Sequence, residues 1–147
     1  MSLPKLNVSV YEAKLPSTNK VIKYRPFLVK EQKILYVSMQ GENNELQIAD
    51  AIGQLVKNCT FDMIDPLTSP MFDIEYIFLQ IRSKSVGENV EVIVKCPDDN
   101  ETKVPVKINL QDVSVQMTTG HSNEIKLSDN MKLVLRYPIL RDMKNIK

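Results

Sequence analysis

The sequence predicts an α+β fold made of a single domain, residues 1–147. Apolar residues recur at a helical period of about 3.6 residues between positions 28 and 85, and they alternate every second residue before and after that region. A chain of 147 residues is also long enough to bury one core. We therefore expect a small N-terminal β-hairpin, about three helices, and an antiparallel β-meander from about residue 88 to residue 137.

The N-terminal hairpin is predicted from two short segments. In NVSVYEAKL, Val8 and Val10 lie on one side of a strand and Tyr11 on the other. The polar turn PSTNK follows, and KVIKYRPF supplies the returning strand. Pro26 ends this strand, because proline cannot donate to a ladder of backbone hydrogen bonds.

Two helices are predicted next, over residues 28–40 and 45–58. The second has the clearer pattern, with polar residues opposite one apolar stripe. Because Cys59 falls on this stripe, we expect a buried, structural thiol. The stripe of the first helix consists of Leu28, Ile34, Leu35 and Met39, and that of the second of Ile48, Ile52, Leu55, Val56 and Cys59.

The central segment SPMFDIEYIFLQIRSKSVGE predicts a third helix, from about residue 70 to 85. Ser69 is the expected N-cap, Pro70 the first helical residue, and Gly87 the stop. Its apolar residues are too many for a single buried face. Either the helix is covered on all sides within the domain, or part of its surface binds another protein.

The second half of the chain changes to the strand period. ENVEVIVKC, the turn PDDN and ETKVPVKINL predict a β-hairpin, with Cys96 on the inward face and Pro105 at an edge. VSVQM (113–117) and MKLVLRY (131–137) are predicted as further strands around a polar loop, TTGHSNEIKLSDN. The last stretch, 138–147, has helical spacing without a stop signal, which predicts an incomplete helix or a C-terminally truncated chain.

Composition limits the classes of partner. The 19 basic and 18 acidic side chains nearly balance, which disfavours nucleic acid or an anionic membrane as the main partner. No apolar run approaches the roughly 20 residues that cross a bilayer, and the first residues lack a secretory signal. The 2 cysteines are too few for a disulfide framework and indicate a reducing compartment.

The sequence contains weak candidates for chemistry. His121 is the only histidine, and it lies in a polar loop; four carboxylates surround the start of the central helix. We interpret His121 as a solvated loop residue and the carboxylates as helix N-terminal charges, so no catalytic, cofactor-binding or metal-ligating residue and no small-molecule substrate is predicted. A small hydrolase remains an alternative that would use Asp62, Asp65, Asp73 or His121; Glu75 is the fourth of these carboxylates.

A third hypothesis is an accessory protein that binds nucleic acid. The N-terminal hairpin and the residues after it are basic, but few aromatic residues accompany these charges. A solvated surface is the simpler interpretation. The basic residues are Lys14, Lys20, Lys23, Arg25 and Lys30.

Two phrases, YRPFLVKE (24–31) and FDIEYIFLQIRSKSVGE (72–88), resemble the T4-like bacteriophage baseplate hub assembly proteins of contractile-tailed phages and prophages. The resemblance covers about residues 4–138. It implies a non-enzymatic protein that acts through contacts with other baseplate and tail proteins, and it leaves a homo-oligomer open. It also implies a location in the host bacterial cytoplasm during assembly, or in the tail baseplate of the virion.

Residues for partner contact are predicted on this basis. The centres of protein interfaces are enriched in Tyr, Phe, Met and Arg, and these residue types gather in the central helix and just after the N-terminal hairpin. The candidates are Met71, Phe72, Tyr76, Phe78 and Arg82 in the helix, and Tyr24, Arg25 and Phe27 in the second patch.

Overall fold

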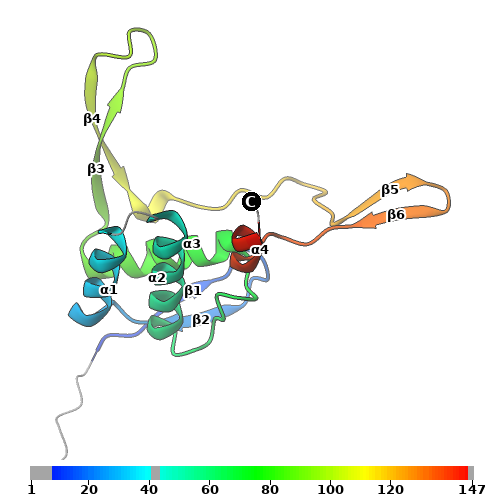
Figure 1. The fold of residues 1–147 in the computed structure, drawn as a ribbon, viewed down its shortest axis with the longest axis horizontal. Coiled ribbons are helices and arrows are strands. Elements are labelled where there is room, and N and C mark those ends of the chain that lie inside the picture. Colours follow the sequence, from blue (N-terminus) through cyan, green and yellow to red (C-terminus); the bar gives the residue numbers. More distant parts are fainter. Residues whose placement is uncertain (1–7, 41–43, 146–147) are drawn as a thin grey trace, which may run out of the picture.

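Helices form the body of the molecule, one β-hairpin covers a side of it, and two further hairpins project away (Figure 1). This computed structural model describes residues 8–40 and 44–145. In chain order the elements are β1 (Tyr11–Lys14), β2 (Val21–Tyr24), α1 (Val29–Met39), α2 (Asn44–Cys59), α3 (Met71–Ser85), β3 (Asn89–Lys95), β4 (Lys103–Asn109), a short 3-10 helix (Leu110–Asp112), β5 (Glu124–Ser128), β6 (Met131–Val134) and α4 (Leu140–Asn145). The predicted α+β class is confirmed.

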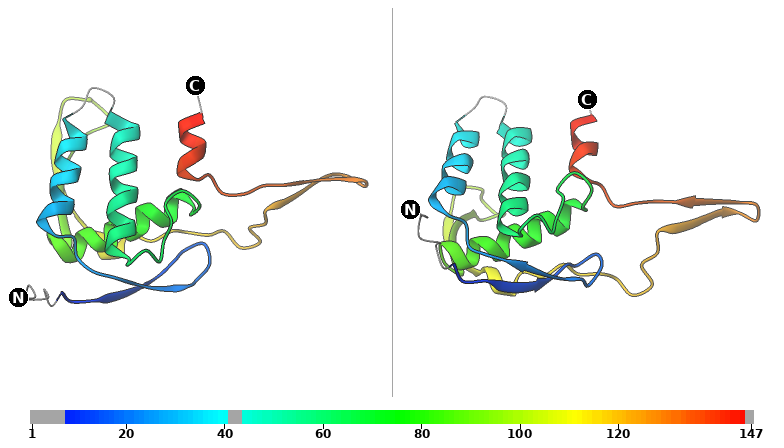
Figure 2. Two further views of the ribbon diagram at one scale, coloured as in Figure 1. Left: turned by 60° about the horizontal axis from the view of Figure 1, so that its bottom comes forward. Right: turned by 90° about the horizontal axis from the view of Figure 1, so that it is seen from below.

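The core lies between the β1–β2 hairpin, α2 and α3 (Figure 2). The predicted stripe of α2 supplies much of it, since Leu55, Val56 and Cys59 are fully buried. The buried thiol predicted at Cys59 is therefore confirmed. The other members of this cluster are Ile22 and Tyr24 of β2, Ile64 of the following loop, and Ile74, Ile77 and Ile81 of α3.

Helix α3 starts one residue later than predicted. Pro70 occupies the cap position, and its carbonyl accepts the N–H groups of Asp73 and Ile74 at 3.1 and 3.3 Å. The prediction of Ser69 as N-cap is therefore wrong, because Pro70 has an extended ψ of 142° and so lies just outside the helix. The stop is as predicted: α3 ends at Ser85, and Gly87 has a φ of +137°, which disfavours other residues.

The chain beyond residue 88 forms two separate hairpins rather than neighbouring strands of one sheet. β3 pairs with β4 as predicted. The partner of β6 is β5, which lies inside the stretch predicted as a polar loop, whereas residues 113–117 form no strand. The alternation in EIKLS is a strand pattern, and Asp129 and Asn130 make a two-residue turn to β6.

The last helix, α4, packs back onto the body. Leu140 is 2 % exposed and lies beside Gly53 of α2 and Pro66. Just before it, the Pro138 carbonyl accepts the Met71 N–H at 3.0 Å. Leu140 thus docks on the domain, which agrees with the helical spacing predicted for this stretch.

Candidate partner-binding surfaces

An apolar groove of about 440 Å³ lies between α1, α2 and the C-terminal half of α3. Each helix contributes residues spaced three or four positions apart, and such residues share one helix face. Three of the residues predicted for partner contact, Phe27, Phe78 and Arg82, meet in this groove. The remaining lining residues are Gln32, Leu35, Tyr36, Ser38, Met39, Ile48, Ile52 and Val86.

The groove is open to a partner at its rim. Tyr36 is 59 % exposed and Met39 is 60 % exposed, which is high for large apolar side chains. The Nη1 atom of Arg82, one of the lining residues, is buried and has no hydrogen-bond partner among the described residues. An unsatisfied buried donor costs about 1–3 kcal/mol.

The N-terminal half of α3 is covered by the protein's own chain. Phe72 packs edge-on against Tyr137, with ring centroids 4.8 Å apart. Met71 and Tyr76 pack partly buried against the core. The two halves of α3 therefore differ: the segment before α4 covers the first, and the second lines the groove.

The patch predicted after the N-terminal hairpin is mainly structural. Tyr24 is 2 % exposed and belongs to the core, so it offers no surface to a partner. Arg25 donates to the buried carboxylate of Glu31 at 3.0 Å, and its backbone N–H donates to the Cys59 carbonyl. Phe27 is the member of this patch that reaches the groove.

Glu31 is the central group of the contact between the first hairpin and α1, and sequence reasoning missed it. Its carboxylate is fully buried and accepts the Leu28 N–H at 2.7 Å, as the reciprocal half of a helix cap. Burial raises the pKa of Glu31, but the hydrogen bonds from Arg25 and Leu28 and the charges of Arg25 and Lys30 outweigh it and hold the pKa below its usual value. A Glu three residues after a helix start was the available signal.

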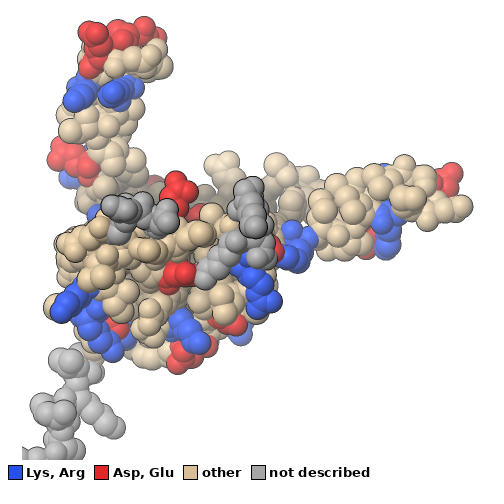
Figure 3. Space-filling model, in the orientation of Figure 1, with Lys and Arg blue, Asp and Glu red and all other residues tan. Residues whose placement is uncertain are grey.

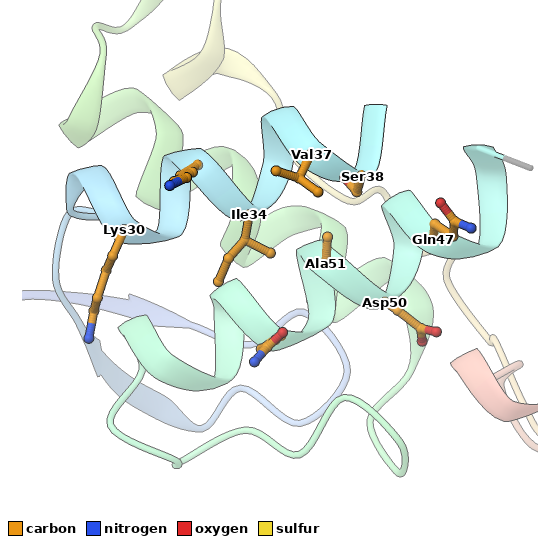
Figure 4. Close-up of a pocket in the computed structure, with 9 residues that line it drawn as sticks. Lys30, Ile34, Val37, Ser38, Gln47, Asp50 and Ala51 are labelled. Carbon is orange, nitrogen blue, oxygen red and sulfur yellow. The ribbon is translucent and has the colours of Figure 1, made fainter. Parts of the chain in front are cut away.

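A second hollow, of about 510 Å³, lies between α1 and α2 and has a mixed lining (Figure 4). Ile34 projects between the two helices, whereas Lys30 and Asp50 extend outward. Its other lining residues are Lys33, Val37, Ser38, Gln47, Ala51 and Gln54. Because polar side chains make up much of this lining, the hollow is a weaker candidate for an apolar contact.

The β3–β4 arm (residues 89–109) and the β5–β6 arm (residues 124–134) project from the helical body (Figure 3), and both expose large apolar side chains. The β3–β4 arm is anchored at its root, where Leu110 is 6 % exposed and its N–H donates to the Glu88 carbonyl at 2.7 Å. A two-stranded hairpin is at best marginally stable alone, so both arms suit binding to another chain. Their exposed apolar residues include Ile93, Val94, Val104, Val106 and Ile108 on the first arm, and Ile125, Leu127, Met131, Leu133 and Val134 on the second.

Cys96 lies where the β3–β4 arm turns, and it is partly exposed. The prediction that it ends an inward-facing strand is wrong, because the strand belongs to a projecting arm whose apolar face has no core behind it. Its Sγ lies 4.0 Å from a carboxylate oxygen of Asp98.

The residues of the hydrolase alternative are not brought together by any of the hollows described. Asp73 is 1 % exposed and holds the turn of the first hairpin, since it accepts hydrogen bonds from the N–H and hydroxyl of Ser17. Asp65 accepts the Leu67 N–H within its own loop. The hollow that contains His121 includes none of the four carboxylates, and the His121 ring stacks on Tyr137.

Basic charges in the first hairpin and just after it are partly neutralised within the chain. Lys30 lies 3.5 Å from Glu31, and Lys23 lies 4.0 Å from Glu12.

In the part of the chain that the structure describes, no group of three or more His, Cys, Asp or Glu could hold a metal ion. No helix within the same ranges is long and apolar enough to cross a membrane.

Comparison with known proteins identifies a family. A family model described as T4 bacteriophage base plate protein matches residues 8–147. No curated protein and no solved structure matches the chain significantly. The family match covers both arms as well as the helical body.

Proposed function

Because the chain belongs to the T4 bacteriophage base plate protein family, we propose that it helps to build the central hub of the baseplate of a contractile tail, without catalysing a reaction. It would act in the host bacterial cytoplasm through contacts with other tail proteins. The observation that supports this most strongly is the apolar groove that joins Phe27, Phe78 and Arg82. Membership in a baseplate family supports the tail as the source of the partner.

The chemistry of the groove suggests how a partner would be recognised. An apolar side chain inserted between α1 and α3 would remove the exposed surface of Tyr36 and Met39 from water. Burial of such a side chain contributes about 1.5–3 kcal/mol, so a few contacts together give a specific complex. A carboxylate or carbonyl oxygen placed against Arg82 would fix the orientation of the partner.

The test uses a substitution at the exposed rim, which leaves the core intact. Met39→Lys places a charge in the groove, and we expect it to lower the recovery of tail proteins with the tagged chain from infected cells at least tenfold. Val29→Lys is the matched control, because Val29 is 81 % exposed on the same helix and lines none of the hollows described here. Circular dichroism would confirm that both variants fold.

Assembly in cells gives the second readout. Cells that lack the wild-type protein should fail to form tails, and the Val29→Lys variant should restore them while Met39→Lys should not. Recovery of no tail protein with the wild-type chain would contradict the proposed function. Equal recovery with both variants would contradict the groove as the contact surface and leave the family role intact.

A further inference from the structure

Each outer edge of the β3–β4 arm carries backbone groups that are unpaired within the hairpin. The hydrogen bonds at the two ends of the hairpin show which residues carry these groups. At the arm's tip the Cys96 N–H donates to the Thr102 carbonyl at 2.9 Å, and at its root the Leu110 N–H donates to the Glu88 carbonyl at 2.7 Å. Hydrogen-bonded pairs alternate with non-hydrogen-bonded pairs along an antiparallel ladder. Both ends of the ladder thus place even-numbered residues in the hydrogen-bonded pairs, and the odd-numbered residues point their N–H and C=O groups outward.

The outer edge of β4 is protected. Pro105, which lies opposite Ile93, is one of the outward-facing positions and has no N–H to offer. Lys103 and Lys107 flank it at the next outward positions. Proline and lysine are the residues with which natural sheets prevent pairing at an edge. β3 carries no proline, and its one lysine, Lys95, shares the outward-facing positions with the opposite charge of Glu91. The edge of β3 is therefore the one open to a further strand.

The sequence of β3 is complementary to itself in the antiparallel direction. If two β3 strands pair about Ile93, then Glu91 of each copy lies opposite Lys95 of the other, and Val92 lies opposite Val94. The outward-facing N–H and C=O groups of Glu91, Ile93 and Lys95 then all meet in hydrogen-bonded pairs, because odd-numbered residues face outward on both strands. Opposite charges placed directly across strands stabilise the pairing.

The isolated arm compensates only one of these two charges. Glu91 lies opposite Lys107 in the hairpin, whereas Lys95 lies directly opposite Lys103, which is a destabilising arrangement of like charges. No ion pair joins Glu91 or Lys95 to another side chain within residues 8–40 and 44–145. A second copy in the register centred on Ile93 supplies each of them with an opposite charge.

We infer that the outer edge of β3 binds the same edge of a second copy of this chain, so that the two arms form one four-stranded antiparallel sheet. The even-numbered residues of both arms then make a continuous apolar face, whose half-exposed members in each copy include Val94, Val104 and Val106. A sheet with more than two strands and one apolar face is more stable than a lone hairpin. This inference does not depend on the groove between the helices.

Charge reversal tests both the pairing and its register. We expect sedimentation velocity to show a concentration-dependent dimer for the wild-type chain. Glu91→Lys and Lys95→Glu should each weaken it about tenfold or more, because each change places like charges opposite each other twice per dimer. The double variant, and an equimolar mixture of the two single variants, should restore it. Glu101→Lys at the tip is the control for Glu91→Lys, since it makes the same change in net charge outside the paired residues.

Three results would overturn the inference. A wild-type chain that stays monomeric at about 0.1 mM would show that the edge does not bind a second copy at a useful affinity. Single reversals that leave the dimer unchanged would exclude the β3 edge as its contact. A mixture that fails to restore dimers would exclude the register centred on Ile93. Binding of a strand from a different tail protein would appear as a monomer that gains mass only in the presence of that protein.

Discussion

The carboxylate of Glu31 and the guanidinium of Arg25 form an ion pair with an N–O distance of 3.0 Å, and the carboxylate is fully buried. This pair joins the end of the first hairpin to the start of α1. Removal of one member of a buried pair leaves the other without compensation. Loss of this pair should therefore lower the stability of the whole domain.

We predict that Glu31→Gln lowers the free energy of unfolding by about 3 kcal/mol, measured by chemical denaturation. Glu12→Gln is the control, because Glu12 is 61 % exposed and lies 4.0 Å from Lys23. An exposed pair of this kind contributes about 0–1 kcal/mol. Equal losses in the two variants would show that the Arg25–Glu31 pair has no special role in stability.

The same pair predicts a dependence on pH. The pKa of Glu31 in the folded state lies below its usual value of 4.5, because the hydrogen bonds and charges around it outweigh the effect of burial. The ionised form is thus favoured by folding, and its contribution is present above pH 4.5 and lost as the pH falls through the folded pKa. When the free energy of unfolding is measured against pH, it should fall less steeply below pH 4.5 in Glu31→Gln than in the wild-type protein.

The turn of the first hairpin should depend on Ser17. This residue donates from its backbone N–H, at 3.0 Å, and from its hydroxyl to Asp73, which is 1 % exposed. Ser17→Ala removes one of these donors from a buried carboxylate and should cost about 1–3 kcal/mol of stability. Ser9→Ala, at an exposed position before β1, should change stability by no more than about 0.5 kcal/mol. Similar values for both would contradict the role of Asp73 as a buried tether.

The two cysteines should differ in reactivity. Burial raises the pKa of the Cys59 thiol to about 11, so very little thiolate forms there at neutral pH. Cys96 is partly exposed at the tip of an arm. A thiol reagent should therefore modify one cysteine in the native protein and two after denaturation. Cys96→Ser should abolish the native reaction; a native reaction that persisted in this variant would place Cys59 within reach of solvent.

The arms should be the least protected regular structure in the monomer. Each is a two-stranded hairpin whose apolar residues lie open to water. Hydrogen exchange measured by mass spectrometry on dilute protein should be much faster in the β3–β4 arm than in α3, whose residues Ile74, Ile77 and Ile81 are buried. Binding of a second copy should slow exchange in β3. Protection of the arm equal to that of α3 in dilute protein would contradict this description.

Much of the helical body could be predicted from local patterns. The stripe of α2 predicted Leu55, Val56 and Cys59 as core residues, and the structure buries all three. The stop of α3 followed from Gly87, because its positive φ is costly for other residues. Such features depend on residues close in the sequence, which is why a single chain reveals them.

Features set by distant contacts were harder to predict. The excess of apolar residues on α3 has two causes at its two ends: Phe72 is covered by Tyr137, and Phe78 lines the groove. No local pattern distinguishes these causes. The pairing of β5 with β6 was not predicted. Ile125 and Leu127 alternate as in a strand, but they stand in a segment whose composition is mainly polar and therefore indicates a loop.

Pro105 limits the size of any assembly that the β3–β4 arms build. The β3–β4 arm of each copy has one strand edge that can accept a neighbour, and pairing between two such arms uses both of these edges at once. The outermost strands of the joined sheet would then each carry a proline in their middle, so growth stops at two chains and cannot continue into a fibre. Pro105 would thus allow β3 to bind a second copy without causing open-ended aggregation through these arms.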